Sequence, residues 1–151
     1  MEVVRKYIMS LLLCVLLIGI TGCGEKKLTC TIKDEEANAK MEGSWVITYK
    51  DDKVLKATNK NVMEAEKETI TLYKNFIENE FNDSLKDIKG FKIDLKQESD
   101  TKYRYEMTFD FNKLDFDELS NKLGESNLNL SKDVSLEQFK KNIIDQGFTC
   151  E

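Results

Sequence analysis

The sequence predicts an α+β domain: one antiparallel sheet of about five strands, built from two hairpins, with one long and two short helices packed on one face. Several segments alternate apolar and polar residues, which indicates strands with one buried and one solvated face. Other segments repeat apolar residues every three or four positions, as amphipathic helices do. Because the strands come in hairpins, the pattern does not fit a doubly wound parallel sheet.

The first strand is predicted at residues 28–33, where Leu28, Cys30 and Ile32 share one face and polar residues lie between them. A hairpin follows over residues 40–62, because two strand-like segments flank the polar turn Asp51-Asp52. The apolar positions of its first strand are Trp45, Ile47 and Tyr49.

The long helix is predicted over residues 65–87, where apolar residues recur in steps of three and four with lysines and glutamates between them. Gly90 is expected to end it, because glycine readily takes the left-handed conformation of a helix C-cap. The apolar stripe consists of Ile70, Tyr73, Ile77, Phe81, Leu85 and Ile88.

Two more strands, at residues 91–96 and 102–111, form the second predicted hairpin around a polar loop at residues 98–101. A short helix is predicted at 116–123, with a capping box of Asp115 and Glu118. The last helix, at 136–146, should begin with a similar box of Ser135 and Gln138. It should end at Gly147, with Phe148 as the hydrophobic contact beyond the cap.

The N-terminus has the layout of a secretory signal peptide: the basic pair Arg5 and Lys6, an apolar run over residues 8–20, and a small-residue site. That run is shorter than the roughly 20 residues that a membrane-spanning helix needs. Since the site ends in Gly22-Cys23, the segment resembles a bacterial lipoprotein signal, which implies diacylglycerol on the Cys23 sulfur and palmitate as an acyl chain. An ordinary cleaved signal and an uncleaved anchor are the alternatives.

This interpretation divides the chain into a signal peptide (1–22), a lipidated tether (23–27) and a single α+β domain (28–151). It places the protein at the cell membrane, lipid-anchored and facing the extracytoplasmic side. Cys14 leaves with the signal and Cys23 carries lipid, so Cys30 and Cys150 remain. Outside the cytoplasm such a pair predicts a disulfide, and two buried free thiols are the alternative.

Composition excludes several kinds of chemistry. The chain contains no histidine, which removes the commonest general base and metal ligand. Its seven glycines are scattered, so no glycine-rich phosphate loop exists. The net charge of −5 for the whole chain argues against nucleic-acid binding and against an electrostatic grip on anionic lipid. We therefore expect no catalytic residue, no cofactor and no metal site.

Two groups of residues are candidates for a functional site. The acidic cluster Asp110, Asp115, Asp117 and Glu118 matches no calcium loop, and a helix N-terminus explains it better than hydrolysis of glycosides. The aromatic residues Tyr103, Tyr105, Phe109 and Phe111 could line a ligand groove, although a core-facing strand explains them as well.

Trp45 and Tyr49 could lie on a strand near the sheet edge, where a partner strand can add. Packing in the core is the expected role of both residues.

Four short segments are typical of one family of small bacterial lipoproteins: Thr21-Gly22-Cys23-Gly24, Asp52-Lys53-Val54-Leu55-Lys56, Ile88-Lys89-Gly90 and Asn112-Lys113-Leu114-Asp115-Phe116. On these segments the chain resembles the YehR-like family, whose function is unknown. The start Leu28-Thr29-Cys30-Thr31 is similar to related small lipoproteins of Gram-positive bacteria. The resemblance supports the fold and the location and brings no catalytic residues.

Three function classes follow. The first is a non-enzymatic binding or interaction module of the cell envelope, with a protein or envelope polymer as partner, no nucleic acid, and a monomeric state. The second is a small-ligand or lipid binder that uses a cleft between sheet and helices. The third is a histidine-free hydrolase that acts through carboxylates, which would require two inward carboxylates facing each other across a cleft; we expect that the protein is not an enzyme. An apolar cavity of roughly 300 Å³ or more would favour the second class, and a filled interface would favour the first.

Overall fold

The computed structural model describes residues 24–36, 38–123 and 130–151. One six-stranded sheet runs through this part of the chain in the order β4-β5-β3-β2-β1-β6, with all neighbours antiparallel. The strands are β1 (Lys26–Glu36), β2 (Ala39–Lys50), β3 (Lys53–Ala65), β4 (Phe91–Ser99), β5 (Lys102–Asp110) and β6 (Thr149–Cys150). The helices are α2 (Lys67–Ile77), α3 (Asp83–Leu85), α4 (Phe116–Leu123) and α5 (Leu136–Asp145).

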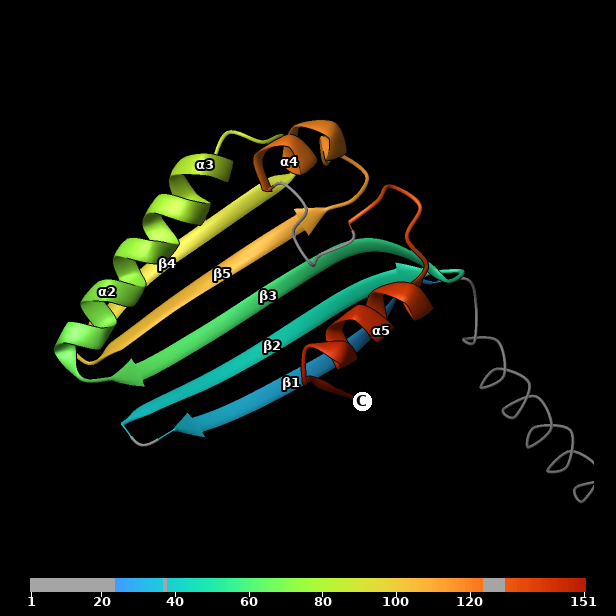
Figure 1. Cartoon of the computed structure of the whole chain (residues 1–151). Helices are drawn as coiled ribbons and strands as arrows, with labels where there is room; N and C mark the ends of the chain where they lie inside the picture. The colour runs from blue at the N-terminus through green and yellow to red at the C-terminus, as the bar shows by residue number, and fades with distance from the viewer. Residues whose placement is uncertain (1–23, 37, 124–129) are drawn as a thin grey trace, which may run out of the picture.

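The helices lie on one face of the sheet, as Figure 1 shows, with α2, α3 and α4 toward β4 and β5, and α5 above β1 and β2. The opposite face, called here the open face, carries no helix of the described residues. The α+β class and the arrangement of helices on one face are therefore confirmed. The sheet has six strands where about five were expected, because the chain after Gly147 adds the short strand β6 beside β1.

The turn between β2 and β3 explains how two aspartates can close a hairpin. Asp51 and Asp52 both have positive φ angles, of 48° and 64°. A two-residue turn of this kind matches the twist of the flanking strands, and aspartate tolerates the left-handed region better than most residues. The hairpin is therefore confirmed, and its strands extend beyond the predicted ends.

The predicted long helix is one continuous helical segment with a π-helical turn, Glu78–Asn82, between α2 and α3. Its apolar stripe contains three successive steps of four residues, from Tyr73 to Leu85. On an α-helix each such step over-rotates by about 40°, so three steps would carry the stripe about 120° around the axis. The wider π turn takes up part of that rotation and keeps Phe81 and Leu85 directed at the sheet.

Gly90 does not cap the long helix, which ends at Leu85, so that prediction was wrong. Gly90 has a φ angle of +82° and lies in the turn before β4. A Cβ atom at this position would overlap the backbone of Leu114. The glycine is required because the segment after β5 passes directly over it.

The core fills the space between the helix-covered face and the helices. Trp45 lies near its centre, with ring centroids 6.2 Å from Phe109 and 5.6 Å from Phe139 of α5. A second cluster under α2 contains Ile70, Ile77, Tyr103 and Ala65. Leu119 of α4 and Phe139 and Ile143 of α5 are buried in the same core, so both short helices pack on this face of the sheet.

In each predicted capping box, the hydrogen bond from the backbone amide to the N-cap side chain is present. Asp115 Oδ1 accepts a hydrogen bond from the Glu118 amide at 2.9 Å, and Ser135 Oγ accepts one from the Gln138 amide at 3.1 Å. The return bond expected at the first box is replaced, because the Asp115 amide donates to the Lys89 carbonyl. Gly147, with φ +95°, ends α5 as predicted.

Candidate functional site

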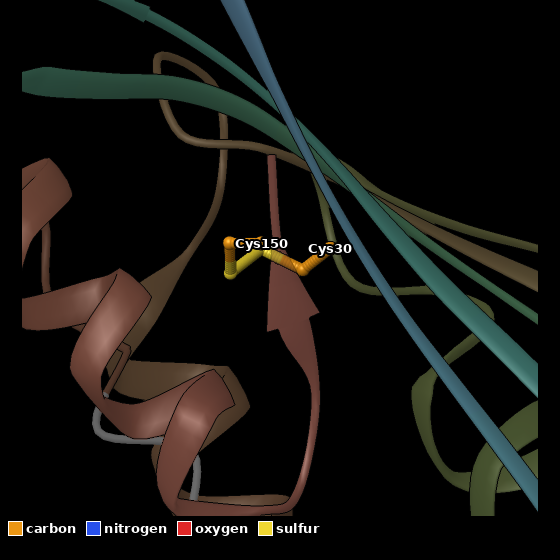
Figure 2. The surroundings of a disulfide bond; sticks show 2 residues. All are labelled: Cys30 and Cys150. Carbon is orange, nitrogen blue, oxygen red and sulfur yellow. A yellow bond between two sulfur atoms is a disulfide. The ribbon is translucent and has the colours of Figure 1, made fainter.

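The C-terminus is fixed to the first strand by a disulfide between Cys30 and Cys150. Figure 2 shows β6 beside β1, with the two sulfur atoms joined. Thr29 and Glu151 exchange two backbone hydrogen bonds, so the two cysteines occupy the next position, a non-hydrogen-bonded pair in which side chains come closest. Their Cα atoms are 3.9 Å apart. The predicted disulfide is therefore present, and it holds the segment after α5 against the sheet.

Gly43 on β2 makes room for this docking. A Cβ atom there would lie 2.8 Å from Ile32 Cγ2 and 3.3 Å from a ring carbon of Phe148, the residue that follows Gly147. It would also lie 2.7 Å from the side-chain oxygen of Asn61. The missing side chain lets three neighbouring side chains converge over β2.

Two buried asparagines on β3 are the polar feature that the sequence analysis missed. Asn59 and Asn61 face the helix-covered side, where the alternation calls for apolar residues. Asn61 Nδ2 donates to Asn59 Oδ1, and Asn59 Nδ2 donates to the Ser44 carbonyl at 3.4 Å. One amide bonds to the other and the second bonds to the backbone, so the two asparagines form a packed polar pair and not a ligand site. Polar residues at inward positions of a strand were the available signal.

Three tyrosines gather between α2 and β5. The Tyr73 ring lies 6.3 Å from that of Tyr103 and 6.2 Å from that of Tyr105. Burial raises the pKa of all three hydroxyls, that of Tyr103 to about 12. The Tyr103 hydroxyl is buried and has no hydrogen-bond partner among the residues that the structure describes. Raised pKa values keep the three groups protonated, so they are poor general bases at neutral pH.

The aromatic stripe of β5 is therefore core. Tyr103, Phe109 and Phe111 are almost completely buried, and Tyr105 is half-buried beside the core.

Trp45 and Tyr49 do not lie at a sheet edge, so the edge hypothesis was wrong. Their strand β2 is internal, with β1 on one side and β3 on the other. Trp45 is only 4% exposed.

The acidic cluster is occupied by structural contacts. Asp115 caps α4, Asp110 pairs with Lys113 at 3.1 Å, and Glu118 pairs with Lys122 at 3.5 Å. Among the described residues, no group of three or more acidic or cysteine side chains is arranged to hold a metal ion. The interpretation as a helix N-terminus is supported.

The described surface includes a larger and a smaller hollow. One, of about 430 Å³, lies at the strand tips between the β1–β2 turn and Thr101, and glutamates and a lysine line much of it. Its charged members are Glu35, Lys40, Glu64 and Glu66. The other, of about 210 Å³, lies between β1, β2 and β3 and is lined by residues such as Thr31, Ser44 and Lys60. Neither is the apolar enclosed cavity that a lipid binder would need.

The predicted lipid-attachment residue Cys23 lies outside the described residues. In residues 24–36, 38–123 and 130–151, no helix combines the length and the apolar character needed to cross a membrane.

A family model described as "Protein of unknown function (DUF1307)" matches residues 29–149. The chain belongs to the DUF1307 family. The match covers every strand and helix described above except the first three residues of β1 and the last residue of β6. A search of curated proteins finds no match.

Two solved structures have a fold similar to that of this chain. One is the NMR structure of a protein from Streptococcus pneumoniae TIGR4, with 21% identity and a TM-score of 0.58, covering 85% of this chain and 86% of that one. The other is the NMR structure of the E. coli YehR protein, with 22% identity and a TM-score of 0.55, covering 84% of this chain and 92% of that one. The resemblance to a YehR-like domain of unknown function is confirmed.

Proposed function

We propose that this protein is a lipid-anchored, extracytoplasmic lipoprotein of the bacterial envelope, and that its folded domain is a non-enzymatic module that binds a protein partner. The observation that carries the binding role is the open face of the sheet. Helices cover the other face, so the open face is a sheet surface that no described helix covers (Figure 1).

The anchor follows from the order of residues. A thioether on Cys23 would stand only three residues before β1, which begins at Lys26. The domain would then sit close to the membrane surface. A disulfide between Cys30 and Cys150 agrees with this placement, because such bonds persist in oxidising compartments outside the cytoplasm.

The middle of the open face is formed by short side chains. Thr29, Val46, Thr58 and Thr108 lie side by side across β1, β2, β3 and β5. The hydroxyls of Thr58 and Thr108 are 3.3 Å apart. Because these side chains are short, a partner can approach the sheet without displacing long side chains. Release of water from the methyl groups of these β-branched residues would favour the contact.

Charged residues border this band. Lys33 and Glu42 pair across β1 and β2 at 3.1 Å, and Lys60 and Glu106 lie opposite each other on β3 and β5. Both signs are present, which suits a protein surface of mixed charge better than a uniformly charged polymer.

An enzyme has little support from the described residues. The carboxylates considered for hydrolysis cap a helix or pair with lysines. The small-ligand alternative is also weaker, because the 430 Å³ hollow is open, is bordered by charged side chains and lies at the strand tips, away from the space between sheet and helices.

Site-specific photocrosslinking in living cells tests the binding role. A photoreactive residue at Thr58, on the open face, should give a discrete crosslinked band with an envelope protein. The same residue at Lys141, which is exposed on α5, is the control and should give none. Equal products from both positions, or a product that only glycan-degrading enzymes remove, would overturn the assignment to a protein partner.

Metabolic labelling with an alkyne fatty acid tests the anchor separately. The wild-type chain should incorporate label and Cys23→Ser should not. Equal labelling of the two chains would contradict the lipoprotein assignment while leaving the crosslinking result unaffected.

A further inference from the structure

We infer that the outer edge of β4 pairs with the same edge of a second copy of this chain, so that two sheets join across a two-fold axis at Leu95. The inference goes beyond the proposed function and does not depend on the lipid anchor. It rests on the position of β4, on the direction of its backbone groups and on the charges along it.

β4 is a border strand of the sheet. It pairs with β5 on one side, and no described strand pairs with it on the other. Figure 1 shows it as the outermost strand on the side of α2. Nine residues, Phe91–Ser99, therefore present one free edge. Such an edge can accept a strand from another chain.

The free backbone groups can be identified from the ladder. The Asp110 amide donates to the Gly90 carbonyl, so Gly90 and Asp110 form a hydrogen-bonded pair. Pairs of this kind alternate along an antiparallel ladder, which assigns the inward groups to Lys92, Asp94 and Lys96. The amides and carbonyls of the residues between them then point outward. These residues are Ile93, Leu95 and Gln97.

Two charged residues of β4 lie opposite residues of the same charge on β5. Asp94 lies directly opposite Glu106, and Lys96 lies directly opposite Arg104. Like charges at directly opposed positions destabilise a sheet. Neither Asp94 nor Lys96 takes part in an ion pair with any described residue. The intramolecular register thus leaves each of these charges opposite a like charge and without an ion pair among the described residues.

A second copy supplies the missing partners. In antiparallel pairing with Leu95 on the two-fold axis, Asp94 of each chain lies opposite Lys96 of the other. Leu95 then faces Leu95, and Ile93 faces Gln97, which gives about six backbone hydrogen bonds. Moving the axis by one residue would place Asp94 opposite Asp94 or Lys96 opposite Lys96. The charge pattern therefore selects one register.

Sedimentation velocity of the chain from Gly24 onward tests the inference. This part keeps every described strand, helix and core residue. An edge of this size should associate weakly, with a dissociation constant on the order of micromolar to hundreds of micromolar. The sedimentation coefficient should rise with concentration toward that of a dimer. It should fall when the salt concentration is raised, because the ion pairs are exposed.

Charge exchange separates this contact from non-specific association. Asp94→Lys and Lys96→Glu should each weaken dimerisation about tenfold or more, because each places like charges across the axis. Each should leave the melting temperature equal or higher, since it also creates an opposite-charge pair with Glu106 or Arg104. The double variant, Asp94→Lys with Lys96→Glu, should restore dimerisation to near the wild-type level.

Backbone pairing has its own readout. The amides of Ile93, Leu95 and Gln97 should exchange with solvent quickly at low protein concentration and slowly at concentrations that give dimer. A wild-type chain that stays monomeric up to about 1 mM would overturn the inference. So would single variants that associate like the wild type, a double variant that fails to recover, or edge amides whose exchange is independent of concentration.

Discussion

Removal of the Cys30–Cys150 disulfide should lower the free energy of unfolding by about 4–5 kcal/mol. The bond joins residues separated by 120 positions in the sequence. In the chain-entropy model, a loop of that length restricts the unfolded chain by about 5 kcal/mol at 25 °C. For a domain of this size, the loss corresponds to a fall in melting temperature of roughly 15 °C.

Circular dichroism during heating measures the effect on the chain from Gly24 onward. The comparison is between the oxidised chain, the same chain with reductant, and a double variant, Cys30→Ala with Cys150→Ala. Cys30 is completely buried, so intact mass after alkylation must confirm that reductant has opened the bond. The reduced chain and the double variant should melt at similar temperatures, and reductant should not change the melting of the double variant.

The reasoning would be refuted by a fully reduced chain that melts within about 2 °C of the oxidised one. That result would mean that β6 and α5 hold their positions through packing alone. A double variant much less stable than the reduced chain would point instead to the void left by the Cys30 sulfur in the core.

Phe109→Ala should cost about 3–5 kcal/mol in denaturant unfolding, because it empties a buried position that contacts Trp45. Lys102→Ala, on the same strand but with its weak exposed pair to Glu98, should cost under about 0.5 kcal/mol, and equal losses would show that the strand faces are wrongly assigned. Tyr103→Phe should change stability by less than about 1 kcal/mol or raise it, because the lost hydroxyl has no hydrogen-bond partner in the described part of the chain. Burial raises the pKa of Tyr103 to about 12, so between about pH 10 and 12 only the unfolded tyrosine releases its proton and the wild type should lose stability. Chemical unfolding across that range should show a smaller loss for Tyr103→Phe, and identical losses would contradict the burial argument.

Local patterns predicted the strands and their faces because side-chain alternation is a property of one strand. Phe109 and Lys102 of β5 could be assigned to opposite sides without knowing which strands lie beside them. Capped helices were predictable for the same reason, since Ser135 and Gln138 interact within one turn. The disulfide was predictable from elimination among four cysteines.

Strand order could not be obtained in the same way. β2 is internal because it pairs with β1 and β3, its neighbours along the chain. β3 pairs with β5 and not with the next strand in the sequence, so β4 lies at the edge of the sheet. The pairing of β3 with β5 depends on contacts between distant segments, which alternation within one strand does not reveal. The pattern also did not show that β1 pairs with β2, so an edge position for Trp45 stayed open as an alternative to packing in the core. Gly90 was misassigned for a similar reason, because the constraint on it comes from Leu114, 24 positions later.

The candidate site was only partly predictable. Cys30 and Cys150 were paired from the sequence, whereas the mismatch between Asp94 and Glu106 exists only once the register of β4 against β5 is known. Asn59 and Asn61 were visible as polar residues at inward positions. Their mutual hydrogen bond explains why the core tolerates them.

The disulfide also changes what proteolysis can do to this protein. Nearly the whole folded chain lies between Cys30 and Cys150, including the turns that join the strands. A single cut at any peptide bond in that interval produces two polypeptides that remain covalently linked through sulfur. Release of a fragment therefore requires a second cut or a reductant, and a nicked molecule keeps both of its pieces attached to the segment that contains Cys23.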